Sequence, residues 1–128
     1  MRVLICGSRH WNDAAAIRRV LIELKDEIEV LIEGEAEGAD MLARIEAEKL
    51  GIKVLPYEAD WDKYGRAAGP IRNSAMLTKG QPNVVIAFHE NLFESHGTLD
   101  MVKRALRQGI SIRIYGTSVK ELKHAESR

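Results

Sequence analysis

Five short apolar segments alternate along the chain with segments that have helical periodicity. The apolar segments are Arg2–Cys6, Glu29–Glu33, Ile52–Pro56, Asn83–Phe88 and Ile110–Ile114. Strands that alternate with helices at this spacing predict right-handed β-α-β units, in which helices cover both faces of a parallel sheet. The sequence therefore predicts an α/β fold, a three-layer α/β/α sandwich with a five-stranded parallel sheet in the order 3-2-1-4-5.

Four segments between the strands predict helices. They run from a cap at Asn12 or Asp13 to about Lys25, from about Ala39 to Leu50, from Pro70 to about Lys79, and from about Thr98 to Gln108. The residues expected to face inward from the second and fourth of these helices are Leu42, Ala43, Ile45, Leu99, Val102, Ala105 and Leu106. The segment from Tyr57 to Gly69 has no clean period, so we expect a long loop there.

Length and charge limit the class of protein. A chain of 128 residues predicts one domain, over residues 1–116, followed by a tail over residues 117–128. The formal net charge is zero, so no general electrostatic attraction to nucleic acid or lipid is expected. No apolar segment approaches the roughly 20 residues that cross a bilayer. We therefore expect a cytoplasmic protein with no membrane segment, in which Cys6 is a buried apolar residue.

Four polar loops follow the carboxyl ends of predicted strands. They are Gly7–Trp11, Gly34–Asp40, Asp60–Arg72 and His89–Thr98. In an open parallel sheet these loops lie at the same edge, and ligands bind where the direction of winding reverses. The sequence therefore predicts one ligand site, at the ends of the first and fourth strands.

The first two loops contain groups that suit a polar ligand, and each group also has an ordinary structural explanation. Ser8 can donate a hydroxyl and Arg9 a guanidinium fork to a phosphate, or the pair can form a tight turn with a solvated arginine. Asp40 can accept a ribose hydroxyl, or it can simply stabilise the first turn of a helix. Glu35 and Glu37 would repel a phosphate unless they point outward.

The third loop combines aromatic and charged residues, namely Asp60, Trp61, Tyr64 and Arg66. They can stack on a base and hold a charged group, or they can pack on one another as a compact surface loop. Arg72 is expected at the positive start of a helix, where a bound anion explains it better than stability does.

The fourth loop ends at Gly97-Thr98, and Thr98 is expected to cap the following helix. The histidines His10, His89 and His96 form no recognisable zinc spacing with carboxylates or with Cys6. Neither a metal nor another cofactor is therefore expected.

Several of these motifs together resemble a known family. The segments VLICGSRHWND, GEAEGAD and ADWDKYGRAAGPIRNSAML, followed by an apolar strand and a GT motif, resemble the YspA-like, YpsA-related branch of the SLOG superfamily. The resemblance extends from Arg2 to about Ile114. It implies a Rossmann-like domain that binds nucleotides or nucleotide-derived signals. The ligand contacts that it implies are Gly7, Ser8, Arg9, Gly34, Gly38, Asp40, Arg72, Asn73, Gly97 and Thr98.

The resemblance leaves three functions open. The first is a binding domain for a nucleotide or nucleotide-sugar, as a sensor, carrier or sequestering protein. The second is cleavage of a nucleotide's N-glycosidic bond, because Arg72-Asn73-x-x-Met76 resembles the arginine motif of the lonely-guy phosphoribohydrolases. Met101 stands at the position of their catalytic glutamate, so Asp100, the nearest acid, would have to replace it, or else Asp40 or Asp60.

The third function is binding of single-stranded DNA, by resemblance to the DNA-processing protein A branch. Neutral charge and few aromatic residues weaken this hypothesis, because such binders combine a basic groove with stacking platforms. A homodimer is expected by analogy with the superfamily.

Overall fold

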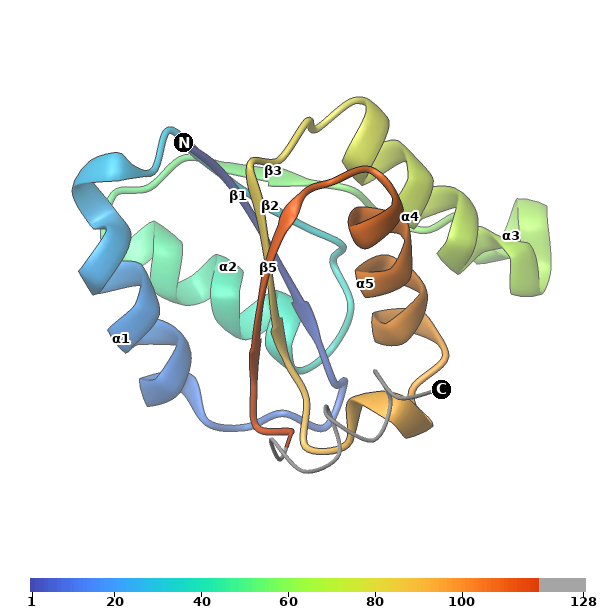
Figure 1. Cartoon of the computed structure of the whole chain (residues 1–128), viewed down its shortest axis with the longest axis horizontal. Helices are drawn as coiled ribbons and strands as arrows, with labels where there is room; N and C mark the ends of the chain where they lie inside the picture. Colours follow the sequence, from blue (N-terminus) through green and yellow to red (C-terminus); the bar gives the residue numbers. More distant parts are fainter. Residues whose placement is uncertain (118–128) are drawn as a thin grey trace.

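The sheet consists of five parallel strands in the order β3-β2-β1-β4-β5, as the sequence predicts (Figure 1). The computed structural model describes residues 1–117. The strands are β1 (Arg2–Gly7), β2 (Val30–Glu33), β3 (Val54–Pro56), β4 (Val84–Phe88) and β5 (Ser111–Tyr115). Strands β1 and β4 pair from Val3 opposite Val84 to Gly7 opposite Phe88. The winding therefore reverses between their carboxyl ends.

Helices cover both faces of the sheet, which completes the predicted three-layer sandwich (Figure 1). Helices α1 (Ala14–Leu24) and α2 (Ala39–Lys49) lie on one face, and α4 (Ala68–Thr78) and α5 (Gly97–Arg107) lie on the other. The shorter elements are α3 (Trp61–Tyr64) and the 3₁₀ turns η1 (Lys25–Glu27), η2 (Gly65–Ala67) and η3 (Leu92–Glu94). Asp13 caps α1 by accepting from the N–H of Ala16.

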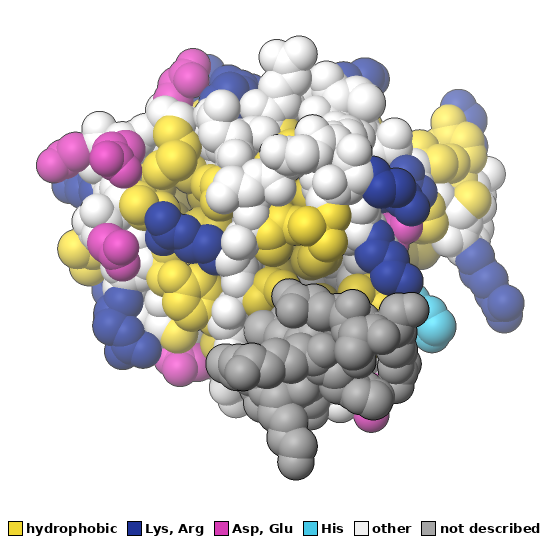
Figure 2. Space-filling model, in the orientation of Figure 1, with side chains coloured by type: hydrophobic (Ala, Val, Ile, Leu, Met, Phe, Trp, Pro, Cys, Tyr) yellow, Lys and Arg dark blue, Asp and Glu magenta, His cyan; other side chains and the backbone are white. Residues whose placement is uncertain are grey.

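Alternate residues of the strands supply two hydrophobic clusters, one on each face. Val3 and Ile5 of β1 pack under α1 and α2, whereas Leu4 and Cys6 pack under α4 and α5. Every residue of β4 is buried, as expected for an interior strand. Residues of β5 are at most half-buried, and hydrophobic side chains remain visible beside this edge strand (Figure 2).

The prediction of a long loop from Tyr57 to Gly69 is wrong. This segment contains α3 and η2, and α4 begins at Ala68, two residues before Pro70. Asp60 caps α3 by accepting from the N–H of Lys63 at 3.1 Å. Pro70 still lies in the first turn of α4, where its missing N–H removes no helical hydrogen bond. A helix of one turn is too short to show a 3.6-residue period, so the sequence does not reveal α3.

Two inward-facing residues are also wrongly predicted, since Ile45 is 43% exposed and Leu106 is 62% exposed. Helix α2 instead buries small residues and Glu46 against α1. Arg18 of α1 donates from Nε and Nη2 to the two carboxylate oxygens of Glu46, at 2.9 and 3.0 Å. The Arg18 guanidinium lowers the pKa of Glu46 to about 2. The paired charge explains why a glutamate, and not Ile45, lies inside.

The chain leaves the sheet after β5 through Thr117, the first residue of the predicted tail. Its hydroxyl donates to the carbonyl of His89 at 2.8 Å and accepts from the N–H of Leu92 at 3.1 Å. The rest of that tail, residues 118–128, lies outside the described residues. Among the described helices, none is both long and apolar enough to span a membrane.

Candidate functional site

A cleft of about 630 Å³ opens at the carboxyl edge of the sheet, over the ends of β1 and β4. All four polar loops contribute to its lining. The candidate residues that the structure brings together there are Gly7, Ser8, Arg9, Asp40, Trp61, Arg72, Asn73, Gly97 and Thr98. The cleft therefore lies at the reversal of winding, where an open parallel sheet places its ligands.

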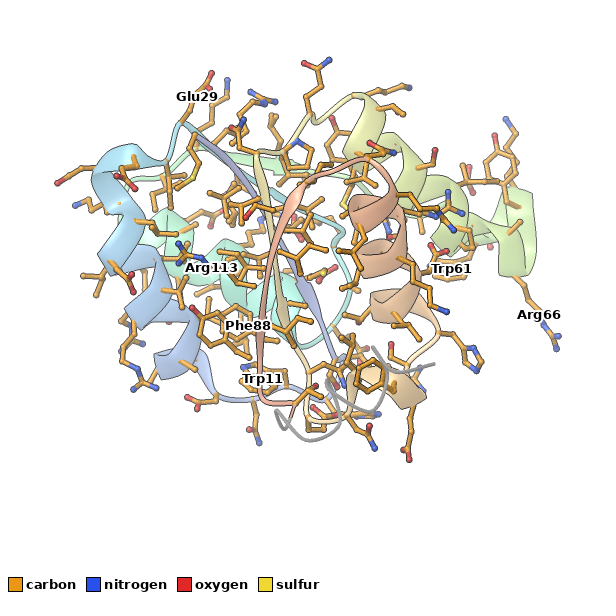
Figure 3. All side chains as sticks on the ribbon, in the orientation of Figure 1. Trp11, Glu29, Trp61, Arg66, Phe88 and Arg113 are labelled. Carbon is orange, nitrogen blue, oxygen red and sulfur yellow. The ribbon has the colours of Figure 1, made fainter. Side chains whose placement is uncertain are left out.

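The other candidate residues lie outside the lining. They are Gly34, Gly38, Asp60, Tyr64, Arg66 and Asp100. Tyr64 and Arg66 are exposed on α3 and η2, and the side chain of Arg66 points away from the body of the protein (Figure 3). Asp60 caps α3. Gly34, Gly38 and Asp100 support residues that do line the cleft.

Close backbone approach explains two of the glycines. A Cβ atom at Gly7 would overlap the carbonyl oxygen of Phe88, and one at Gly38 would overlap that of Ser8. Gly38 also has a φ of +76°, which L side chains rarely adopt. The N–H of Ala39 donates to the Ser8 carbonyl at 3.0 Å. The start of α2 is therefore held directly against the loop that follows β1.

Asp40 organises the loop that follows β2. Its Oδ2 accepts from the backbone N–H groups of Gly34 and Ala36, at 3.2 and 3.3 Å. Burial raises the pKa of Asp40 to about 6, although Arg72 and the two amides oppose this rise. A Cβ atom at Gly34 would lie 2.7 Å from Nη1 of Arg72 and 2.9 Å from Asp40 Oδ2. A side chain at Gly34 would therefore have to displace Arg72 and Asp40 from the loop.

The glutamates of this loop do not face the cleft. Glu37 is exposed, and Glu35 forms a salt bridge with Arg44 at 2.6 Å. Beneath the loop, Glu33 is fully buried, and its Oε1 accepts from the N–H of Glu35 at 2.6 Å. Burial raises the pKa of Glu33, whose Oε2 has no partner among the described residues.

Arg72 and Asn73 form the wall on the side of α4. Arg72 donates from Nη1 to the carbonyl of Gly34 at 2.6 Å and from Nε to Asn73 Oδ1 at 3.1 Å. Because α4 begins at Ala68, Arg72 is its fifth residue and does not lie at its positive end. The prediction that the helix start makes Arg72 unfavourable is therefore wrong, and Asp40 supplies a nearby opposite charge.

Asp100 lies behind this wall. The Nδ2 group of Asn73 donates to Asp100 Oδ2 at 3.0 Å and to the carbonyl of Gly97 at 3.2 Å. Arg104 also donates to Asp100 Oδ2, at 2.8 Å. Asp100 thus positions Asn73 and contributes no group to the cleft lining.

The start of α5 differs from the prediction. Thr98 is buried and does not cap the helix; its N–H instead donates to Ser95 Oγ at 3.0 Å. Helix α5 begins at Gly97, one residue earlier than expected, and its N-cap residue is His96, whose side chain makes no capping hydrogen bond. No atom would contact a Cβ at Gly97, so the backbone here faces open space in the cleft.

Sequence reasoning missed the polar groups that follow β4. Glu90, Glu94, Ser95, His89 and His96 all line the cleft, as does His10 from the loop that follows β1. The sequence signal that could have identified the groups after β4 was their position directly after the most apolar strand. Ser8 Oγ donates to Glu90 Oε1 at 2.8 Å, and the N–H of Asn91 donates to His89 Nδ1 at 2.9 Å. Within residues 1–117, no group of three or more His, Cys, Asp or Glu side chains is placed to hold a metal ion.

The chain matches a protein-family model, a curated protein and a solved structure. The model of the YspA, cpYpsA-related SLOG family matches residues 1–64. The Gene 61 protein of Mycobacterium phage D29 is 35% identical over an aligned length of 126 residues, and the match covers 90% of this chain and 96% of that protein.

Among solved structures, the X-ray structure of DNA processing protein A from Streptococcus pneumoniae is similar, with a TM-score of 0.72 and 23% identity. The match covers 88% of this chain and 49% of the other. At this identity the likeness shows a common fold, and the chain spans about half the length of that protein.

Proposed function

The chain belongs to the YspA, cpYpsA-related SLOG family, and from this premise we propose that it binds a nucleotide or nucleotide-derived small molecule in the cleft. One observation supports the proposal most. Loops from four strand ends place an arginine, a helix start and an aromatic ring around a single cleft at the reversal of winding. These are the groups that a phosphate and a base require.

The phosphate is assigned to the side of the cleft formed by Arg72 and the start of α5. Two N–H groups of Arg72 are already bound to Gly34 and Asn73, so its guanidinium is held at the wall before any ligand arrives. A helix N-terminus with open space at Gly97 adds a favourable dipole for an anion. Arg9, exposed on the loop that follows β1, is a second cation in the lining.

The base is assigned to Trp61. This side chain lines the cleft but is 59% exposed, so a ring face is available for stacking. Binding of this kind fits a sensor, a carrier or a sequestering protein, none of which needs a reaction.

Substitution of Arg72 tests the phosphate assignment. Calorimetric titration of AMP, GMP, CMP and UMP identifies the tightest-binding nucleotide. Arg72→Gln should weaken that affinity at least about 10-fold, because a charge-assisted hydrogen bond to phosphate contributes roughly 1.5–3 kcal/mol. Arg113→Gln is the matched control, since Arg113 is exposed on β5 and lies outside the cleft lining.

Arg72→Gln also removes the hydrogen bond to Gly34, so thermal unfolding without ligand must show a folded protein. For wild-type protein, nucleotide at 100 times its Kd should add about 2.7 kcal/mol to the free energy of unfolding. Equal affinity of wild-type and Arg72→Gln proteins would overturn the assignment of phosphate to Arg72.

N-glycosidic cleavage is a second candidate, and the environment of Asp40 favours it. A cleft carboxyl with a pKa near 6 can hold a proton close to neutral pH, as a general acid must. Asp100, the acid first expected for this role, is bound to Asn73 and Arg104. Incubation with the nucleoside monophosphates should then release free base, and Asp40→Asn should stop the release. Chromatograms without free base would refute cleavage and leave binding in place.

Binding of single-stranded DNA has less support. The likeness to DNA processing protein A concerns the fold, and the net charge of zero offers no general attraction to phosphates. A gel shift of single-stranded DNA that appears at low salt and weakens as the salt concentration rises would support this function.

A further inference from the structure

Ser8 and Glu90 form a side-chain pair where the winding reverses. Ser8 follows β1, and its N–H donates to the carbonyl of Phe88 at 2.9 Å, which continues the pairing of β1 with β4. Two residues after Phe88, Glu90 accepts from the Ser8 hydroxyl at 2.8 Å. Both residues line the cleft. Strand pairing therefore fixes the backbone on both sides of this hydrogen bond.

The direction of the Ser8 hydroxyl is determined by its neighbours. Its oxygen accepts from the N–H of His10 at 3.0 Å, and its proton points to the carboxylate of Glu90. The hydroxyl proton is consequently not available for a ligand, which was one function expected for Ser8. Its role is to hold one oxygen of Glu90 in place.

The Glu90 carboxylate is ionised and lacks a salt-bridge partner. Burial opposes ionisation, but the Ser8 hydroxyl, the backbone N–H of Glu90 and the adjacent His89 and His10 together lower the pKa of Glu90. None of the salt bridges among the described residues involves Glu90.

His89 does not neutralise this charge. Its Nδ1 accepts from the N–H of Asn91, so that nitrogen carries no proton and the neutral ring holds its proton on Nε2. Burial lowers the pKa of His89 as well. The charge of Glu90 therefore remains available to a ligand.

A carboxylate in a cleft that binds phosphate elsewhere needs a ligand group that donates hydrogen bonds. The vicinal hydroxyls of ribose are such donors, whereas a second phosphate would be repelled. Asp40 is less suited to this role, because it is 5% exposed and its Oδ2 already accepts two backbone hydrogen bonds. Glu90 is exposed, and only its Oε1 is bound by another side chain among the described residues.

We propose that Glu90, oriented by Ser8, binds the sugar hydroxyls of the ligand and makes the cleft selective for ribonucleotides over deoxyribonucleotides. This inference rests on the nucleotide binding proposed above. It places phosphate at Arg72 and the start of α5, and the sugar at Glu90, which lies next to β4 in the same cleft lining.

Calorimetry with the tightest-binding ribonucleoside monophosphate and its 2′-deoxy and 3′-deoxy analogues tests the inference. Wild-type protein should bind the ribonucleotide about 10-fold more tightly than at least one deoxy analogue. In that analogue the sugar hydroxyl that donates to the Glu90 carboxylate is missing. Glu90→Gln keeps the length of the side chain and can still accept from Ser8. It should weaken binding of the ribonucleotide about 10-fold and leave that deoxy analogue within about 3-fold, so that the discrimination disappears.

Two further variants separate recognition of the sugar hydroxyls by Glu90 from a general effect of negative charge in the cleft. Glu94→Gln removes the same charge from the same lining but from a side chain with no bond to Ser8, so it should shift all three affinities together. Ser8→Ala should reduce the discrimination less than Glu90→Gln does, because it frees the carboxylate without removing it. Circular dichroism confirms that each variant is folded.

The possible failures are distinguishable. If Glu90→Gln weakens ribonucleotide and deoxyribonucleotide equally, or if wild-type protein does not discriminate, the role of Glu90 is refuted while nucleotide binding stands. If wild-type protein binds none of the four ribonucleoside monophosphates, the nucleotide-binding proposal fails and the role of Glu90 fails with it.

Discussion

Asp40 has a carboxyl group that is almost enclosed by protein. It accepts hydrogen bonds from two backbone amides and lies near Arg72, yet burial still raises its pKa to about 6. Its ordinary value is 3.8. The folded protein therefore holds the Asp40 proton more tightly than the unfolded chain does. As pH rises from about 4 to about 7, the unfolded chain loses this proton first, and stability falls.

Asp40→Asn tests this pH dependence. A shift of one pKa unit corresponds to about 1.4 kcal/mol, so from pH 4.5 to 7.5 wild-type protein should lose about 2 kcal/mol relative to the variant. Above about pH 7, where Asp40 is ionised in both states, the difference should stay constant. Urea unfolding at several pH values measures it, with Asp26→Asn on the exposed turn η1 as a control for removal of one charge. A difference that does not change over this range would contradict the raised pKa.

Helix α3 carries the aromatic side of the cleft. It has four residues, begins at the Asp60 cap and projects beyond α4 (Figures 1 and 3). Trp61 is therefore held at the rim of the cleft by a short element and remains largely exposed. The other tryptophan, Trp11, packs with its ring centroid 5.6 Å from that of Phe88 and lies outside the lining.

The two tryptophans allow a direct optical test of α3. In a Trp11→Phe variant, Trp61 is the sole fluorophore, and we expect its emission to change as the tightest-binding nucleotide is added, because a base stacks on the ring. In the matched Trp61→Phe variant, the emission of Trp11 should not change. Calorimetric binding to Trp11→Phe protein without any change in Trp61 emission would remove Trp61 from the site.

The whole molecule has two hydrophobic clusters that share one sheet. Leu31 of β2 belongs to one cluster and Ile32 to the other, as do neighbouring residues of β1 and β4. If either layer of helices unfolded, it would expose one face of the strands. The same strands support the helices on the opposite face. The two clusters are therefore expected to unfold together.

Unfolding of the complete chain tests this coupling. In the Trp61→Phe variant, far-UV circular dichroism, which reports on all helices, and Trp11 fluorescence, which reports on the face of α1 and α2, should give coincident transitions in urea. The buffer must contain a reductant, because Cys6 is a free thiol that unfolding exposes. Two separated transitions would show that one face unfolds independently.

The sequence by itself determined the architecture, the strand order and the edge of the sheet where the loops meet. Alternating apolar segments and helical periods are local, and the right-handed crossover rule converts them into a topology. The same reasoning placed Arg72 and Asn73 near Gly97.

Only the tertiary structure decided which acids face the cleft. Asp100 turns towards Asn73, whereas Glu90 reaches Ser8, which is 82 residues away in sequence. Such contacts depend on how loops from separate strands pack against one another. No periodicity or motif records that packing, so the position of each carboxylate had to come from the folded chain.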